Sequence, residues 1–128
     1  MQHLQKCDLC ITLQFMKLLK IIIYATPTGR EPFSDWEDGL DKKMRAIVKN
    51  RLDRVTLGNF GDAKMIKGGG GIWELVIDHG PGYRIYFGKQ GSTVVLLLTG
   101  GEKKSQDRDI IKAKQYWLKS KESHEKKI

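Results

Sequence analysis

The side chains with the most chemical potential in this sequence are cationic and stand in or next to predicted strands. Arg84 occupies the middle of the strand pattern "YRIYF", where a core strand would carry an apolar residue. Lys64 falls in the short strand pattern "AKMIK", and Lys103 and Lys104 follow the glycine pair of "TGGEKK". Guanidinium and ammonium groups that gather at one point neutralise the charge of a phosphodiester. These residues therefore predict a site for phosphate chemistry.

Two neighbouring strand patterns decide what lies beside Arg84. Side chains alternate between the two faces of a strand, so each pattern divides into two sets. One face collects the apolar side chains of Leu75, Ile77, Ile85 and Phe87. The other face collects Glu74, Val76, Arg84 and Tyr86. We expect helices to cover the apolar face and the other face to stay open, where Arg84 forms a solvated cross-strand pair with Glu74.

The segment after the last strand pattern adds anion-binding features. In "TGGEKKSQDRD" two glycines and two lysines stand between a strand end and a helix amino terminus, where free N–H groups and the helix dipole favour an anion. Taken singly, each lysine is more typical of a solvated surface. Together with Arg84 they predict a basic pocket with an aromatic floor, suited to a phosphodiester and a stacked base. The residues expected to contact nucleic acid there are Lys67, His79, Tyr86 and Lys104.

The order of the patterns predicts an α+β domain with a mainly antiparallel, twisted sheet. "KLLKIIIYA" is the first strand, and Pro32 stands at the start of a short helix. A longer amphipathic helix starts at Asp41 and ends at Gly58, and the two helices are expected to form a hairpin on one face of the sheet. The apolar period then changes to two for four strands, and a final helix begins near Ser105.

Glycine-rich stretches separate the strands. "GGGG" at residues 68–71 lacks the Lys-Ser/Thr of a phosphate-binding loop, so it is predicted to be an ordinary connection. In "HGPGY" we expect a type II turn with Pro81 in the second position and Gly82 in the third. His79 borders this turn, and a polar turn residue is its simpler interpretation.

The length of the chain indicates how many domains it forms, and its net charge indicates the class of partner. The 128 residues suffice for one domain, which we expect to span residues 16–122, after a poorly ordered leader or over-extended start at 1–15 and before a frayed tail at 123–128. Lys and Arg outnumber Asp and Glu by 23 to 15, and the net charge of +8 favours polyanionic partners. The most apolar window is interrupted by Gln14, Lys17 and Lys20, so no membrane span is expected and the chain is predicted to be cytoplasmic.

The two cysteines form half of a metal-binding motif. Cys7 and Cys10 have CxxC spacing, but no second CxxC or HxxxH follows to complete a tetrahedral site. We therefore expect neither a metal ion nor a cofactor.

Three consecutive motifs resemble the phage-derived, HigB-like branch of the RelE/ParE toxin superfamily, the addiction module killer proteins. They are "RLDRVTLGNFGDAK", "WELVIDHGPGYRIYF" and "LLLTGGEKKSQDRDIIKAK", and the resemblance runs in matching order from about residue 19 to residue 117. It implies a RelE-like fold of strand, two helices, four strands and a helix. It also implies a toxin that cuts mRNA, commonly on the ribosome, and a cognate antitoxin encoded beside it, expected to be of the helix-turn-helix type.

The resemblance also implies roles for individual residues. Arg84 of "GYR" would contact the scissile phosphate, and Lys103 and Lys64 would complete a metal-free basic site. The sequence departs from the family at Val76, where relatives often carry the arginine of "ELR", and "GGDK" has become "GGEK". The missing arginine bears on catalytic strength more than on the fold.

RNA cleavage of this kind uses the 2'-OH of the RNA as nucleophile and needs a base and charge neutralisation. We expect Arg84 and Lys103 to stabilise the transition state, with Lys64 as candidate base; Glu74 is either an alternative base or the group that orients Arg84. Two other functions remain open at this point. The first is inhibition of DNA gyrase without RNA cleavage, as in other toxins of this superfamily, and the second is a non-catalytic RNA-binding module.

Overall fold

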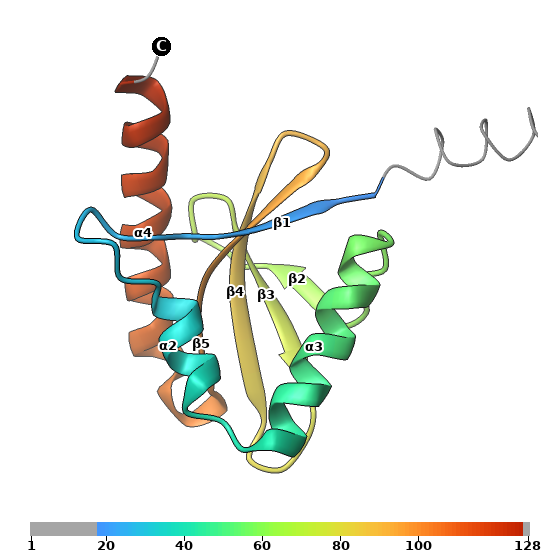
Figure 1. Ribbon diagram of the computed structural model, residues 1–128. Coiled ribbons are helices and arrows are strands. Elements are labelled where there is room, and N and C mark those ends of the chain that lie inside the picture. Colours follow the sequence, from blue (N-terminus) through green and yellow to red (C-terminus); the bar gives the residue numbers. More distant parts are fainter. Residues whose placement is uncertain (1–17, 127–128) are drawn as a thin grey trace, which may run out of the picture.

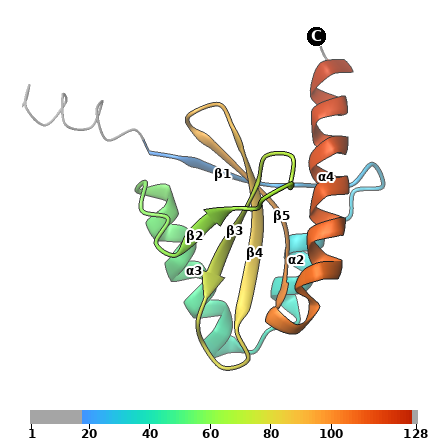
Figure 2. The same cartoon turned by 180° about the vertical axis from the view of Figure 1, so that it is seen from behind.

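The computed structural model describes residues 18–126, with side chains through residue 122. A five-stranded sheet carries two helices on one face and one on the other (Figures 1 and 2). The elements are β1 (Lys20–Ile23), α2 (Pro32–Asp38), α3 (Lys42–Thr56), β2 (Ala63–Met65), β3 (Ile72–Ile77), β4 (Tyr83–Gln90), β5 (Val94–Glu102), a 3-10 turn η1 (Lys103–Ser105) and α4 (Gln106–Lys126). The predicted α+β class is confirmed.

The sheet is antiparallel except at one edge. Its strand order is β1-β5-β4-β3-β2, and β1 pairs with β5 in parallel while the remaining neighbours are antiparallel. β5 therefore lies inside the sheet and carries apolar residues on both faces. Val95 and Leu97 pack toward α2 and α3, whereas Leu96 and Leu98 pack toward α4.

Helix α3 forms where its caps and its apolar stripe coincide. The Asp41 carboxylate accepts a hydrogen bond from the Met44 N–H at 2.7 Å, which caps the amino end. Met44, Val48 and Val55 form the buried side of the helix. The carboxyl end lies one residue earlier than predicted, with Leu57 at the cap and Gly58 just beyond it at φ +89°. Helices α2 and α3 share one face of the sheet but diverge from their connecting loop (Figure 1).

The turn between β3 and β4 differs from the predicted type II turn. Its hydrogen bond runs from the Gly82 N–H to the His79 carbonyl at 3.0 Å, so the turn spans residues 79–82. Gly80, with φ +56°, takes the second position and Pro81 the third. Only glycine adopts such a φ without strain, and proline fits the third position because its fixed φ is negative.

Helix α4 packs across the face opposite α2 and α3 (Figure 2). Trp117 is pressed against Gly88 of β4, where no side chain would fit, and its indole N–H donates to the Gly70 carbonyl at 3.0 Å. The helix continues to Lys126. Within the described part of the chain no helix has the length and apolarity needed to cross a membrane.

Candidate active site

The sheet register brings the predicted site residues to the α4 side of strands β2, β3 and β4. Glu74 is the cross-strand partner of Lys64 on one side and of Tyr86 on the other. Arg84 lies two residues closer to the β3–β4 turn, opposite Val76. Directly opposed residues of antiparallel strands share a face, so the predicted alternation is confirmed.

Glu74 is the most deeply buried charge of this face. Its side chain is 1% exposed, and one carboxylate oxygen, Oε2, accepts a hydrogen bond from the Gln106 side-chain amide at 2.7 Å. The other oxygen, Oε1, lies 3.6 Å from Nε of Arg84. The expected Arg84–Glu74 ion pair exists, but it is diagonal and buried, so the expectation of a solvated pair is wrong.

The Arg84 guanidinium and the aliphatic part of the Lys103 side chain both lie next to Gly82. The Arg84 side chain is 12% exposed, and its Nη1 donates to the Tyr83 carbonyl at 3.2 Å. A Cβ placed on Gly82 would lie 3.7 Å from this Nη1 and 3.4 Å from Cβ of Lys103. The Lys103 N–H also donates to the Gly82 carbonyl at 2.9 Å, which joins the start of η1 to the β3–β4 turn. One glycine therefore lies between the guanidinium and the lysine.

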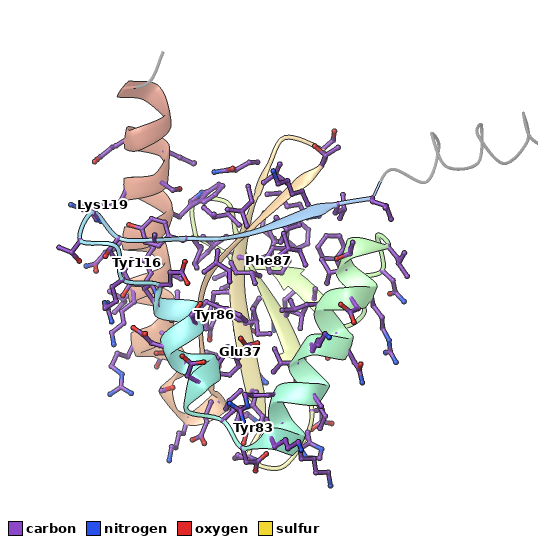
Figure 3. All side chains as sticks on the ribbon, viewed as in Figure 1. Glu37, Tyr83, Tyr86, Phe87, Tyr116 and Lys119 are labelled. Atoms are coloured by element: carbon purple, nitrogen blue, oxygen red, sulfur yellow. The ribbon has the colours of Figure 1, made fainter. Side chains whose placement is uncertain are left out.

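Tyr86 lies beneath α4 and is fully buried. Figure 3 shows it in the middle of the sheet, well above Tyr83 on the same strand. The expectation that its ring forms the floor of an open pocket is therefore wrong, because no base can reach the ring in this arrangement. Burial raises the pKa of the Tyr86 hydroxyl well above its ordinary value, and the negative charges of Glu74 and Asp109 raise it further, against the opposing effect of Arg84.

The four remaining cationic candidates differ in position. Lys64 is exposed on β2 opposite Glu74, so it borders the same face as Arg84 with Glu74 between them. Lys67 follows β2 at the end of the sheet away from the β3–β4 turn, and His79 is exposed in that turn. Lys104 pairs with Glu102 at 3.2 Å and is exposed. Lys64, Arg84 and Lys103 thus border one side of the sheet, whereas Lys67 lies apart.

A sequence comparison shows the family of this chain. The sequence model of the family described as "Phage derived protein Gp49-like (DUF891)" matches residues 35–117. The chain belongs to this family. A protein of Haemophilus influenzae strain Rd with the name "Uncharacterized protein" is 43% identical over 83 residues, which cover 64% of this chain and 82% of that protein. The Gp49-like region runs from α2 into α4 and includes Glu74, Arg84 and their hydrogen-bond partners Gln106 and Tyr83.

The two glycines of "TGG" have a packing role in this Gp49-like protein. Gly100 and Gly101 lie in β5, are buried, and pair with Ile85 and Arg84 of β4. A Cβ on Gly100 would collide with the Trp36 ring, and one on Gly101 would collide with the Asp109 carboxylate. The two glycines therefore belong to strand β5 itself and not to a segment between that strand and α4, where the sequence placed them.

Three polar residues at the start of α4 escaped the sequence interpretation. Gln106 binds Glu74, and the Ser105 hydroxyl donates to the Asp109 carboxylate at 2.6 Å. Asp109 is itself 7% exposed. A signal was present, because Gln106 precedes Ile110 by four residues and therefore lies on the same side of the helix.

Two cavities among the described residues lie close to the helices and are not lined by Arg84. One of about 690 Å³ lies between α2 and the start of α4 and includes Trp36, Tyr83 and Arg108 in its lining. Another of about 380 Å³ lies between α2 and α3 over Ile21 and Leu97. The basic strip formed by Lys64, Arg84 and Lys103 lines neither of these two cavities.

No cluster of three or more His, Cys, Asp or Glu side chains within residues 18–122 is arranged to hold a metal ion. Cys7 and Cys10 lie outside the described residues. The chemistry available on this face is that of one guanidinium, two exposed ammonium groups and a buried carboxylate.

Proposed function

We propose that this Gp49-like protein is the toxin of a type II toxin–antitoxin system and that it cuts mRNA, acting on the ribosome, without a metal ion. Its phage-derived family, a toxin-like family of addiction modules, is consistent with the toxin role. The observation that carries the nuclease role is the convergence of Arg84 and Lys103 on Gly82, next to a buried carboxylate that faces the guanidinium.

The proposed reaction is a transesterification in which RNA supplies the nucleophile. The 2'-oxygen attacks phosphorus and the bond to the 5'-oxygen breaks, which leaves a 2',3'-cyclic phosphate and a 5'-hydroxyl. Negative charge builds on the phosphorane oxygens, and fixed cationic donors stabilise that charge more in the transition state than in the substrate. Arg84 is suited to this role because its donors form a planar fork that matches phosphate oxygens.

Proton transfer is assigned to the two lysines. Lys64 takes the proton of the 2'-hydroxyl, and Lys103 gives one to the departing 5'-oxygen. Glu74 fits an orienting role better than that of a base, because it is 1% exposed and its two oxygens face Gln106 and Arg84. RNA cannot reach a carboxylate enclosed in this way.

The proposed partner is a cognate antitoxin encoded next to this gene. A short adjacent reading frame with a helix-turn-helix pattern would support it, and co-expression of that frame would restore growth to cells that make the toxin. The net charge of +8 is suited both to RNA and to an acidic antitoxin segment.

The deciding experiment compares the wild-type protein with Arg84→Ala in cleavage of mRNA on programmed ribosomes. Loss of one fixed charge contact is expected to slow cleavage about 10²- to 10³-fold. Arg54→Ala removes an exposed arginine from α3, on the other side of the sheet, and should cleave like the wild type. Mapping of new mRNA ends then locates the cut sites.

Three results would contradict the nuclease proposal. Full activity of Arg84→Ala would remove Arg84 from the site. Intact mRNA together with inhibited supercoiling would identify a gyrase inhibitor. Salt-sensitive binding of RNA that stays intact would identify an RNA-binding module.

A further inference from the structure

Gln106 makes the side-chain contact on this face that the proposed reaction leaves unexplained. It is the first residue of α4, and its amide donates to Oε2 of Glu74 at 2.7 Å across 32 positions of sequence. A long-range hydrogen bond to a buried carboxylate is stronger than a neutral one and costly to leave unmade.

Glu74 lies between Gln106 and Arg84, so the orientation of its carboxylate links the two side chains. The Nε of Arg84 is buried and has no hydrogen-bond partner among the described residues, and the nearest acidic group is Oε1 of Glu74 at 3.6 Å. The Glu74 oxygen that faces Gln106 and the one that faces Arg84 belong to the same planar carboxylate. Rotation of that carboxylate away from Gln106 would therefore change the group that Arg84 faces.

The amino end of α4 is anchored on both sides of Gln106. The Lys103 N–H is bound to the Gly82 carbonyl, and Ser105 donates to Asp109, which rests on Gly101. These contacts hold the first turn of α4 against β4 and β5. The amide of Gln106 is thereby presented to Glu74 from a fixed backbone, as precise orientation of a neighbouring group requires.

We propose that Gln106 is a positioning residue that holds the Glu74 carboxylate, which in turn keeps the Arg84 guanidinium aimed at the scissile phosphate. The expected effect of Gln106 on cleavage rests on the nuclease function proposed above. Loss of Gln106 slows the chemical step more than it weakens RNA binding. Binding draws on the exposed lysines, whereas the chemical step depends on where the guanidinium stands.

The test uses three variants of the full chain. Gln106→Leu removes the amide donor, and Gln106→Glu keeps the side-chain shape but places acceptors where the donor was. Gln115→Leu makes the matched change at an exposed position of the same helix. For each we would measure the cleavage rate at saturating RNA, the RNA dissociation constant and the NMR signal of the Arg84 Nε–Hε group.

Both Gln106 variants are expected to slow cleavage about 10- to 10²-fold, because displacement of a catalytic group by about 1 Å lowers the reaction rate by up to about this factor. Their dissociation constants should stay within about twofold of the wild type, because the phosphate-binding lysines are untouched. The Arg84 Nε–Hε signal should shift in both Gln106 variants and stay in place in Gln115→Leu. If Gln106→Leu does not fold, Gln106→Glu decides.

The proposal is overturned if the Arg84 signal is the same in the Gln106 variants as in Gln115→Leu, whether or not the cleavage rate falls. It is equally overturned if the signal moves but the chemical step runs at the control rate. If the wild type leaves every RNA intact, the nuclease function fails. The positioning of Arg84 by Gln106 then stands or falls on the NMR signal alone.

Discussion

The two faces of the sheet are both covered by helices, yet they bury different chemistry. Toward α2 and α3 the buried side chains are apolar, among them Val48, Leu75 and Ile85, each 1% exposed or less. Toward α4 the packing residues Leu98 and Trp117 are accompanied by the three buried polar side chains of the described region. These are Glu74, Thr99 and Asp109.

The face toward α2 and α3 stabilises the fold. The face toward α4 carries polar and charged groups whose burial lowers the stability of the protein. An apolar layer of similar volume is often as stable as a buried ion pair, or more stable, because removing charges from water is unfavourable. Two polar atoms of the α4 face, Nε of Arg84 and the Tyr86 hydroxyl, also have no hydrogen-bond partner among the described residues. Stability alone does not account for such an arrangement, whereas a site for a charged substrate does.

Neighbouring residues of β3 allow the comparison to be tested, because Glu74 and Leu75 point to opposite faces. Glu74→Ala should lower the free energy of unfolding by about 3–5 kcal/mol, since it leaves the buried Arg84 without its counter-charge. Cleavage by the folded fraction should also fall, because Arg84 loses its orientation. Urea unfolding gives the first quantity and single-turnover cleavage the second. A stability loss below about 1 kcal/mol would show that the pair is solvated.

Leu75→Ala should affect stability without affecting the site. Leu75 is 1% exposed in the core under α2 and α3, so its truncation should cost about 2–5 kcal/mol. Cleavage per folded molecule should remain at the wild-type value, because Leu75 points to the face of the sheet opposite Glu74 and Arg84. The same two assays apply. A loss of cleavage equal to that of Glu74→Ala would mean that the two faces are not separable.

The fold was largely predictable from the sequence because its signals are local. Period-two alternation in β3 and β4, the Asp41 cap and Pro32 at the start of α2 each depend on a few neighbouring residues. These features fixed the class, the order of the elements and the face on which Arg84 stands.

The position of α4 over the sheet face that carries Arg84 was not predictable from such local signals. The path of α4 over Tyr86 depends on contacts such as Trp117 with Gly88, which join positions distant in sequence. A register shift between β4 and β5 pairs Tyr86 with Thr99 and Phe87 with Leu97. Simple alternation from Leu98 would place Gly100 on the α4 side, whereas the shift places Gly101 there, under Asp109. A β-bulge of this kind leaves no periodic signal in the sequence, so alternation alone does not predict it.

Tyr86→Phe should stabilise the protein by roughly 1 kcal/mol at neutral pH, because a buried hydroxyl without a partner is unfavourable. The difference should grow in alkali. The folded-state pKa of Tyr86 is raised above its unfolded value, mainly by burial, so above pH 10.0 the unfolded chain releases a proton that the folded chain retains. Wild-type stability then falls by up to about 1.4 kcal/mol per pH unit through this group.

The pH profile of unfolding for wild type and Tyr86→Phe measures this effect, because contributions from lysines and from the other tyrosines cancel in the difference. A profile of constant separation from pH 8 to pH 11 would contradict the raised pKa. Destabilisation by Tyr86→Phe at neutral pH would instead show that the hydroxyl donates a hydrogen bond to Glu74, the nearest acidic group on its face.

Val76→Arg tests whether an added positive charge strengthens RNA binding at the basic strip of Lys64, Arg84 and Lys103. Val76 stands directly opposite Arg84, at the position where the resemblance implies an arginine. A second guanidinium there should add one phosphate contact, which steepens the dependence of log affinity on log salt by about 0.7 for single-stranded RNA. The cost in stability should be roughly 0.2–1 kcal/mol, because like charges directly opposite on neighbouring strands repel.

Val76→Gln is the matched control, since it has a long polar side chain without the charge. Fluorescence titration of a short RNA at several salt concentrations gives the slope, which should change in Val76→Arg and not in Val76→Gln. Equal slopes for both variants would mean that RNA does not pass over this strip. The comparison of the two faces would then still explain stability, but the RNA would have to bind elsewhere. The exposed Lys67 and Lys104 would be the next positions to examine.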